Sequence, residues 1–165
     1  MRRYLSAVGL CLALLLASQS VAFAAQELKP FVRGSYQQIV SARAGKPFIV
    51  AFWSVNCTYC AAELSMFGKL LEKYRGLDLV LVSTDTPPDE PAITATLAKF
   101  ALGKAENRVF ADSHADRLRY EVDSEWYGEL PRTYFFAAQE DAKAASGKLE
   151  QAEVERWIKQ QYAPR

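Results

Sequence analysis

Residues 47–64 read PFIVAFWSVNCTYCAAEL, and this stretch decides the fold. Its first part, 47–53, is a continuous apolar run of strand length, which is typical of a strand buried on both faces of a sheet. Two cysteines, Cys57 and Cys60, follow where the pattern changes. Beyond them apolar side chains recur at helical spacing, at Leu64, Phe67, Leu71 and Tyr74. The stretch therefore predicts a strand, a short loop carrying the two cysteines, and a helix.

The rest of the chain alternates between helix-like and strand-like segments. A short helix is expected over 35–45, with Ser35 and Gln38 at the spacing of a capping box. Further strands are expected over 77–83, 107–112, 133–137 and 142–146. Further helices are expected over 91–102, over 115–120, and around Val154, Trp157 and Ile158 near the C-terminal end. Alternation that ends in two consecutive strands and a closing helix predicts an α/β fold with a central mixed β-sheet flanked by helices.

The N-terminal residues have the features of a secretory signal peptide. Arg2 and Arg3 precede an apolar run over 4–17, and AFA at 22–24 offers small residues before a cleavage site. We expect a signal peptide over 1–24 and a mature domain over 25–165. An uncleaved membrane anchor is the alternative, although the run is shorter than the ~20 apolar residues of a spanning helix. The domain is expected outside the cytoplasm, in the periplasm.

Charge and composition exclude some functions. Without residues 1–24 the chain carries 18 basic and 19 acidic residues, and no basic run is visible. Nucleic acid is therefore not an expected partner. Half of the residues are hydrophobic, as in a globular domain. The length left after cleavage is enough for one ordinary core, so no stabilising cross-link is needed.

The cysteine pair is therefore a candidate for chemistry. A bridge between residues three apart closes a very short loop and stabilises little, although a structural disulfide and half of a metal site are the plain alternatives. Cys57 lies where a strand gives way to a helix, and a helix N-terminus lowers a thiol pKa into the ~3.5–7.5 range. Cys60 lies one turn further on, as a resolving cysteine should. C-x-x-C beside a β-α-β pattern is typical of a redox motif.

The same stretch resembles the thioredoxin-fold thiol–disulfide oxidoreductases, especially the periplasmic TlpA/ResA-like branch with its F-W-x-x-W-C-x-x-C-x-x-E pattern. The matching positions are Phe52, Trp53, Cys57, Cys60 and Glu63. Asn56 departs from the pattern, because an aromatic residue usually precedes the first cysteine. Ala51 stands where thioredoxin has a buried acidic residue, and the helix over 91–102 is similar to the branch's inserted helix.

A second matching piece is GELPRTYFF, which is similar to the family's cis-proline segment. The resemblance places the cis-proline at Pro131, with Leu130 before it, where its backbone would pair with an extended substrate; an ordinary trans turn proline is the alternative. Trp53, next to the cysteines, is expected both to pack in the core and to form a wall of the active site, and a plain core residue is the alternative. Glu63 is either a proton handler for Cys60 or a solvated helix residue.

The implied activity is that of a protein-disulfide reductase. Cys57 is the expected nucleophile, Cys60 the resolving residue, and the two form a redox-active disulfide. No cofactor and no metal are required, and a monomer is expected. Expected partners are substrate proteins that carry disulfides or thiols, such as those of cytochrome c maturation, and a membrane-bound electron donor.

Alternatives remain at this point. One is an oxidant of folding proteins. Another is a thioredoxin-like copper carrier, in which Cys57, Cys60 and the single histidine, His114, would bind the metal. Trp126 and Tyr127 precede the proline segment and are either walls of a substrate groove or part of the core.

Overall fold

The computed structural model describes residues 27–138 and 141–162. The predicted signal peptide over 1–24, and Cys11 within it, lie outside these ranges. In the part of the chain that is described, no helix has the length and apolar character needed to cross a membrane.

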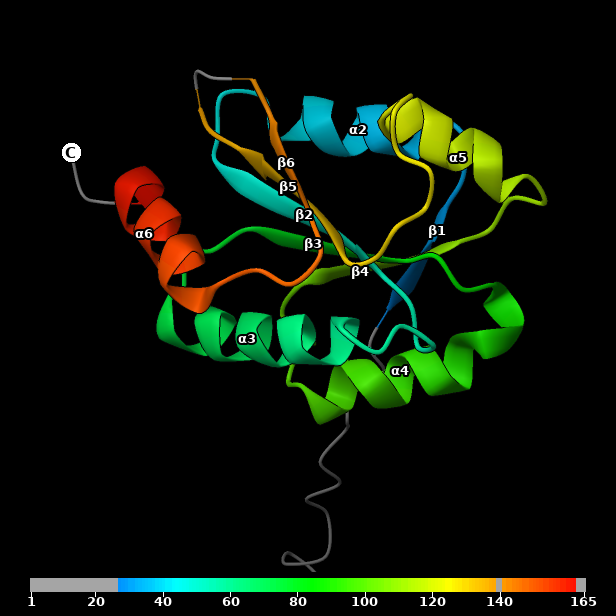
Figure 1. Ribbon diagram of the computed structural model, residues 1–165, viewed down its shortest axis with the longest axis horizontal. Coiled ribbons are helices and arrows are strands. Elements are labelled where there is room, and N and C mark those ends of the chain that lie inside the picture. Colours follow the sequence, from blue (N-terminus) through cyan, green and yellow to red (C-terminus); the bar gives the residue numbers. More distant parts are fainter. Residues whose placement is uncertain (1–26, 139–140, 163–165) are drawn as a thin grey trace, which may run out of the picture.

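A six-stranded sheet forms the centre of the domain (Figure 1), with strand order β1-β4-β3-β2-β5-β6. The strands are β1 (Leu28–Phe31), β2 (Phe48–Trp53), β3 (Leu79–Ser83), β4 (Glu106–Phe110), β5 (Arg132–Phe136) and β6 (Lys143–Ser146). Strands β1, β4, β3 and β2 run parallel to one another. Strand β5 is antiparallel to β2, and β6 is antiparallel to β5. The predicted mixed sheet is therefore confirmed.

Helices cover both faces of the sheet (Figure 1). They are α2 (Ser35–Ala42), α3 (Cys60–Lys73), the short 3-10 helix η1 (Pro87–Asp89), α4 (Glu90–Lys99), α5 (Ala115–Val122) and α6 (Gln151–Tyr162). Side chains of α3, α4 and α6 share one apolar cluster, and those of α2 and α5 share the other. The predicted inserted helix is α4, which lies between β3 and β4.

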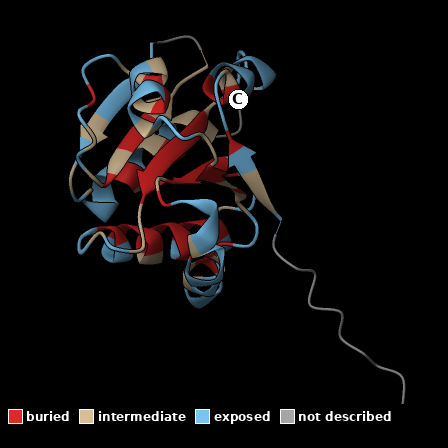
Figure 2. Ribbon diagram, turned by 90° about the vertical axis from the view of Figure 1, so that its right-hand side faces the viewer, coloured by how far each residue is buried: buried red, intermediate tan, exposed pale blue. Residues whose placement is uncertain are grey.

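The strand before the cysteines is buried on both faces, as its apolar run predicts. Ile49, Ala51 and Trp53 belong to the cluster under α3, and the alternate residues of β2 belong to the opposite cluster. All six residues of β2 are buried, and Figure 2 shows buried strands between more exposed helices. Because complete burial of one large apolar side chain contributes about 1.5–3 kcal/mol, this strand is strongly fixed in the core.

The start of α2 differs from the prediction. Its N-cap is Gly34, with φ 79°, and no side chain caps the helix. Ser35 is already the first helical residue. Its hydroxyl does not cap the helix but accepts a 2.9 Å hydrogen bond from the N–H of Val32, in the turn before it. The predicted capping box of Ser35 and Gln38 is therefore wrong. Strand β1, which was not predicted, immediately precedes this turn.

Candidate active site

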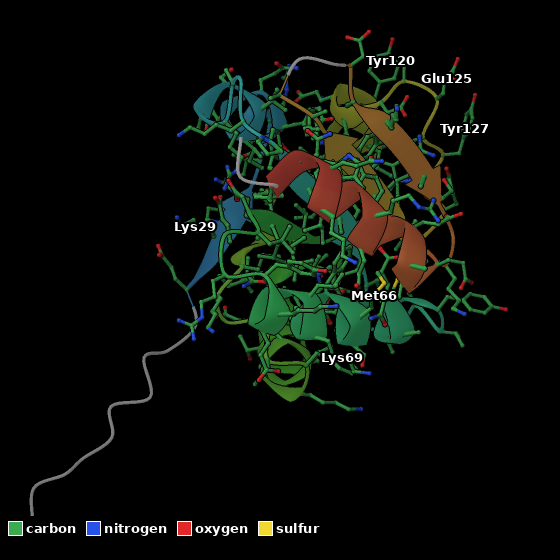
Figure 3. All side chains as sticks on the ribbon, turned by 90° about the vertical axis from the view of Figure 1, so that its left-hand side faces the viewer. Lys29, Met66, Lys69, Tyr120, Glu125 and Tyr127 are labelled. Carbon is green, nitrogen blue, oxygen red and sulfur yellow. A yellow bond between two sulfur atoms is a disulfide. The ribbon has the colours of Figure 1, made fainter. Side chains whose placement is uncertain are left out.

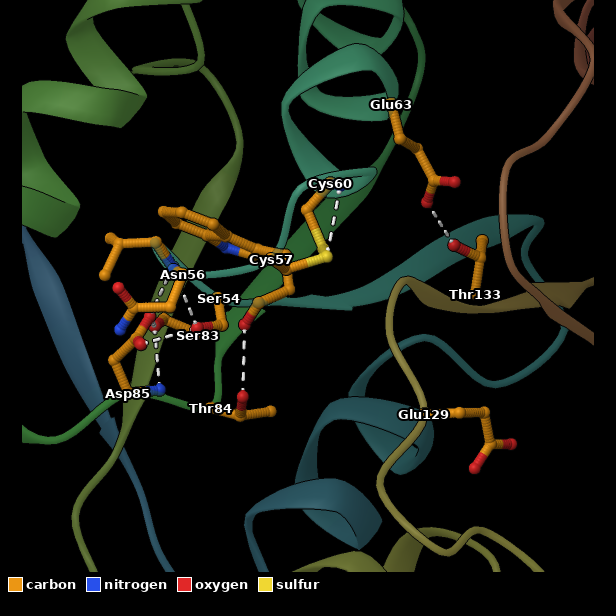
Figure 4. Close-up of a disulfide and its surroundings, with 12 residues drawn as sticks. Ser54, Asn56, Cys57, Cys60, Glu63, Ser83, Thr84, Asp85, Glu129 and Thr133 are labelled. Carbon is orange, nitrogen blue, oxygen red and sulfur yellow. Dashed lines mark hydrogen bonds between the residues drawn. A yellow bond between two sulfur atoms is a disulfide. The ribbon is translucent and has the colours of Figure 1, made fainter.

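The two cysteines form a disulfide at the junction between β2 and α3 (Figure 4), with a Cα–Cα distance of 5.3 Å. Parallel β2 delivers the chain to the carboxyl edge of the sheet, and a short loop, 54–59, leads into the helix. The cysteine pair therefore lies at the position that the change of sequence pattern predicts.

The two sulfur-bearing residues have unequal access to solvent. Cys57 is half-buried in the loop, whereas Cys60 is 1% exposed and is the first residue of α3. The Cys60 backbone N–H donates a 3.1 Å hydrogen bond to the Cys57 sulfur. The same N–H also donates a 3.3 Å bond to the Cys57 carbonyl. Amides at a helix start, together with the helix dipole, favour negative charge on the atom that they face. Cys57 is therefore the accessible sulfur and the one that the helix terminus would stabilise as a thiolate.

Glu63 is buried, at 4% exposed, one turn after Cys60 on α3. Its Oε1 accepts a 2.7 Å hydrogen bond from the Thr133 hydroxyl, and its Oε2 has no hydrogen-bond partner among the described residues. Burial raises the pKa of Glu63 to about 7, although the Thr133 hydroxyl and the nearby Leu149 backbone act in the opposite direction. Leu149 is near enough to lower this pKa, but it makes no well-formed hydrogen bond to Oε2.

A surface cleft of about 220 Å³ lies beside the Glu63 carboxyl. It is formed by α3, on which Met66 and Lys69 line it (Figure 3), and by the segment 148–151 that leads into α6. A buried carboxyl with one unpaired oxygen is thus placed beside a solvent-facing cleft. The pair Glu63–Thr133 was not anticipated from the sequence, which placed Thr133 only at a strand start.

The peptide bond between Leu130 and Pro131 is cis, as the resemblance predicts. Pro131 is buried, and Leu130 is half-buried and packs against both apolar clusters, one of which also contains Cys60. The Pro131 carbonyl accepts a 2.9 Å hydrogen bond from the Gly147 N–H. The structure therefore brings the proline segment, seventy positions from the cysteines, to the same cluster.

Arg132, which follows this proline, braces the segment from inside. Its guanidinium donates hydrogen bonds of 2.6 Å to Asp123, 2.6 Å to the Ser146 hydroxyl and 3.1 Å to the Tyr134 hydroxyl. It also forms an ion pair of 3.4 Å with Glu129. One side chain thus joins the loop before Pro131 to β5 and β6.

The aromatic candidates divide between the core and the surface. Trp53 is 2% exposed and packs in the cluster with Cys60. Trp126 is also core, because its ring contacts Phe52 at 4.7 Å between centroids and its Nε1–H donates a 3.0 Å hydrogen bond to the Glu129 carbonyl. Tyr127 is 90% exposed and projects into solvent (Figure 3).

Among the described residues, His114 belongs to no group of side chains that could hold a metal ion. It is exposed at the start of α5, where its Nδ1 lies 2.9 Å from the Ser113 hydroxyl. Within residues 27–138 and 141–162, no group of three or more His, Cys, Asp or Glu side chains is placed to hold a metal ion. The structure therefore does not assemble the ligand set of the copper-carrier alternative.

Comparisons with known proteins agree with this geometry. A secreted disulfide oxidoreductase of Mycobacterium tuberculosis, described as homologous to E. coli DsbE, is similar with a TM-score of 0.58 and 20% identity over 72% of this chain and 84% of that chain. A thiol:disulfide interchange protein of Chlorobium tepidum is similar with a TM-score of 0.57 and 18% identity over 74% and 83%. A putative thioredoxin of Neisseria meningitidis is similar with a TM-score of 0.54 and 16% identity over 74% and 78%. No curated protein matches the sequence.

The fold and the C-x-x-C disulfide define the class, which is that of the thioredoxin-fold thiol–disulfide oxidoreductases. The family model of the AhpC/TSA family matches residues 22–142. The chain therefore belongs to the AhpC/TSA family. Its place in the TlpA/ResA-like branch is compatible with these findings and stays a prediction.

Proposed function

We propose that the protein works outside the cytoplasm and reduces disulfides in substrate proteins. The observation that carries this proposal is the asymmetry of the cysteine pair. Cys57 is half-buried and accepts a hydrogen bond from the first amide of α3, whereas Cys60 is 1% exposed. A nucleophilic thiolate has to be accessible to the substrate and stabilised as an anion. A resolving thiol has to stay buried and unreacted until the mixed disulfide forms.

The reaction starts from the reduced pair. The Cys57 thiolate attacks one sulfur of the substrate disulfide, a bond forms between these two sulfurs, and the other substrate sulfur leaves as a thiolate. Cys60 then loses its proton and attacks the Cys57 sulfur, which releases the second substrate sulfur. Two electrons have passed to the substrate, and the bond between Cys57 and Cys60 is the product on the enzyme.

Glu63 is the proposed acceptor of the Cys60 proton. The two residues lie three positions apart on α3, so their side chains share a face of the helix. A proton acceptor is most effective when its pKa lies near the working pH. The Glu63 pKa of about 7 supports this role, and the usual acidic position of thioredoxin is occupied by Ala51, which cannot accept a proton.

The direction, location and partners follow from the resemblance and the N-terminal sequence. Resemblance to the TlpA/ResA-like branch supports a reductant of thiols used in cytochrome c or metalloprotein maturation, recharged by a membrane-bound electron donor. A periplasmic location is supported by the signal-like residues 1–24 and by the similar M. tuberculosis protein, which is described as secreted. The protein acts as a monomer, and its cysteines carry the electrons without a cofactor.

A trapping experiment tests the assignment of the two cysteines. In Cys60→Ser the mixed disulfide on Cys57 cannot be resolved, so adducts with substrate proteins should accumulate in the periplasm. Cys57→Ser is the matched control and should trap nothing. If Cys57→Ser accumulated adducts on Cys60, and Cys60→Ser accumulated none on Cys57, the assignment would be reversed.

A second measurement tests the direction. A reductant should be found mainly as the dithiol when cells are quenched with acid and their thiols are alkylated. Loss of its membrane donor should then leave it as the disulfide. A protein found mainly as the disulfide in otherwise normal cells would instead be an oxidant of folding proteins.

A further inference from the structure

The loop that carries Cys57 is attached to the neighbouring strand by one carboxylate, that of Asp85. Strands β2 and β3 are paired up to Trp53 and Ser83, and the Thr84 N–H adds a last backbone bond of 2.8 Å to the Trp53 carbonyl. Beyond Trp53, the hydrogen bonds described between 54–56 and 83–85 all end on the side chain of Asp85 (Figure 4).

Both oxygens of this carboxylate are occupied. Oδ1 accepts a 2.7 Å hydrogen bond from the Ser54 hydroxyl, and Oδ2 accepts bonds of 2.9 Å from the Val55 N–H and 2.6 Å from the Ser83 hydroxyl. Asp85 is only 8% exposed. Hydrogen bonds to an ionised acceptor are about twice as strong as neutral ones, and donors left unpaired inside a protein are costly. The loop is therefore held firmly at Ser54 and Val55.

The restraint passes from Ser54 to Cys57. The Ser54 hydroxyl that donates to Asp85 also accepts a 3.1 Å hydrogen bond from the Asn56 N–H. The Ser54 carbonyl accepts a 3.2 Å bond from the Cys57 N–H. Ser54 therefore holds the backbone N–H groups of both Asn56 and Cys57. The Ser54 side chain is itself held by Asp85.

We propose that Asp85 is a positioning residue for Cys57, which rests on the proposed function. It holds 54–57 in the turn that aims the Cys57 sulfur at solvent and keeps it within reach of the Cys60 amide. Thiolate attack requires a defined approach to the disulfide, and small displacements of a reacting atom reduce rates strongly. Asp85 contacts neither sulfur, so it acts through Ser54 and Val55.

Four variants of the full chain test this proposal. Asp85→Ala removes all three acceptor contacts, whereas Asp85→Asn keeps one oxygen that still accepts from Val55 and Ser83. Ser54→Ala removes only the hydroxyl branch and leaves Asp85 bound to the loop backbone, so it gives an answer even if Asp85→Ala does not fold. The matched control is Asp89→Ala, a half-buried acid that accepts hydrogen bonds from Thr86 on the same stretch and has no described hydrogen bond to 54–57.

The main measurement is the rate of reduction of a small aromatic disulfide by each reduced variant, compared with alkylation by iodoacetamide at alkaline pH. Asp85→Ala should slow disulfide attack about ten- to a hundred-fold, because the sulfur is no longer aimed. Alkylation should change much less, since iodoacetamide tolerates many approach directions. Asp85→Asn should recover most of the rate, Ser54→Ala should be intermediate, and Asp89→Ala should match the wild type.

Two results would overturn the proposal. One is wild-type disulfide attack in Ser54→Ala, with Asp85→Ala either equally unaffected or unable to fold. The other is equal slowing of attack and alkylation in Asp85→Ala and Asp85→Asn, which would assign the effect to the carboxylate charge. Failure of the wild type to reduce protein disulfides such as insulin would refute the proposed function instead, because the comparison on the small disulfide does not depend on it.

Discussion

The Thr133 hydroxyl donates a 2.7 Å hydrogen bond to Glu63 Oε1 and so joins β5 to α3 inside the protein. In the sheet, Thr133 pairs with Ala51 of β2. Ala51 stands where the resemblance expects a buried acid, so Glu63 supplies a carboxyl from the helix next to a position where the strand has none.

The first prediction concerns stability and pH. The folded protein raises the Glu63 pKa from 4.5 to about 7, so it binds this proton more tightly than the unfolded chain does. The resulting stability is complete below pH 4.5 and is lost as the pH rises to about 7, by about 3 kcal/mol in total. Urea unfolding of the oxidised protein at a series of pH values measures this loss. In Glu63→Gln the loss should disappear, and parallel curves for the two proteins would refute the assignment.

The second prediction concerns the resolving step. Glu63→Gln should slow the attack of Cys60 on the mixed disulfide about a hundred-fold near neutral pH, because the proton acceptor is lost. The difference should shrink at alkaline pH, where solvent removes the proton. Stopped-flow fluorescence measures this step, and Cys57 alkylation should be unchanged. Glu72→Gln, an exposed change on the same helix, is the control. Wild-type kinetics in both variants from pH 6 to 9 would leave Glu63 without a role in proton transfer.

The third prediction concerns Thr133. Its hydroxyl lowers the Glu63 pKa by stabilising the charged carboxylate, so Thr133→Val should raise that pKa further above 7. Carbon-13 NMR of labelled glutamate in the oxidised protein measures the titration without interference from thiols. Thr96→Val on α4, which removes a hydroxyl bonded only to a helix carbonyl, should leave the titration unchanged. A fall of the Glu63 pKa in Thr133→Val would show that the hydrogen bond stabilises the neutral acid.

The fourth prediction concerns the close contact between α3 and the end of the inserted helix, α4. A Cβ at Gly68 of α3 would overlap the carbonyl oxygen of Phe100 at the end of α4. Gly68→Ala should therefore destabilise the protein by about 1–3 kcal/mol in urea unfolding, since backbone has to shift. Gly76→Ala is the control, because its Cβ would make an ordinary 3.9 Å contact with Tyr162. Equal stability of the two variants would mean that α4 can move away without cost.

The sequence predicted those elements whose pattern is strong. Strand β2 is apolar on both faces, and α3 carries a regular stripe, so both were found together with the cysteines between them. Strand β1 was missed because it has only four residues and includes Lys29 and Pro30. It is also an edge strand, paired with β4 on one side. An edge strand that is half-exposed and contains proline gives little periodic signal.

The candidate site was predicted in part. Cys57, Cys60 and Pro131 were found from local motifs, but the state of Glu63 depends on segments distant in sequence. Its burial comes from β5 and from 148–151 packing beside α3, which no local pattern reveals. A signal for Asp85 was present, because a polar residue just after β3 lies at the same sheet edge as the residues after β2.

Because β1, β4, β3 and β2 run parallel, their amino ends lie at one pole of the domain and their carboxyl ends at the other. The chain enters β1 at Leu28 from one pole, whereas β2 ends at Trp53 and releases Cys57 at the other. Anything joined to the chain before Leu28 therefore attaches at the pole away from the disulfide. If the apolar N-terminal segment stays in a membrane, the domain is anchored from the end of the parallel strands that is opposite the disulfide.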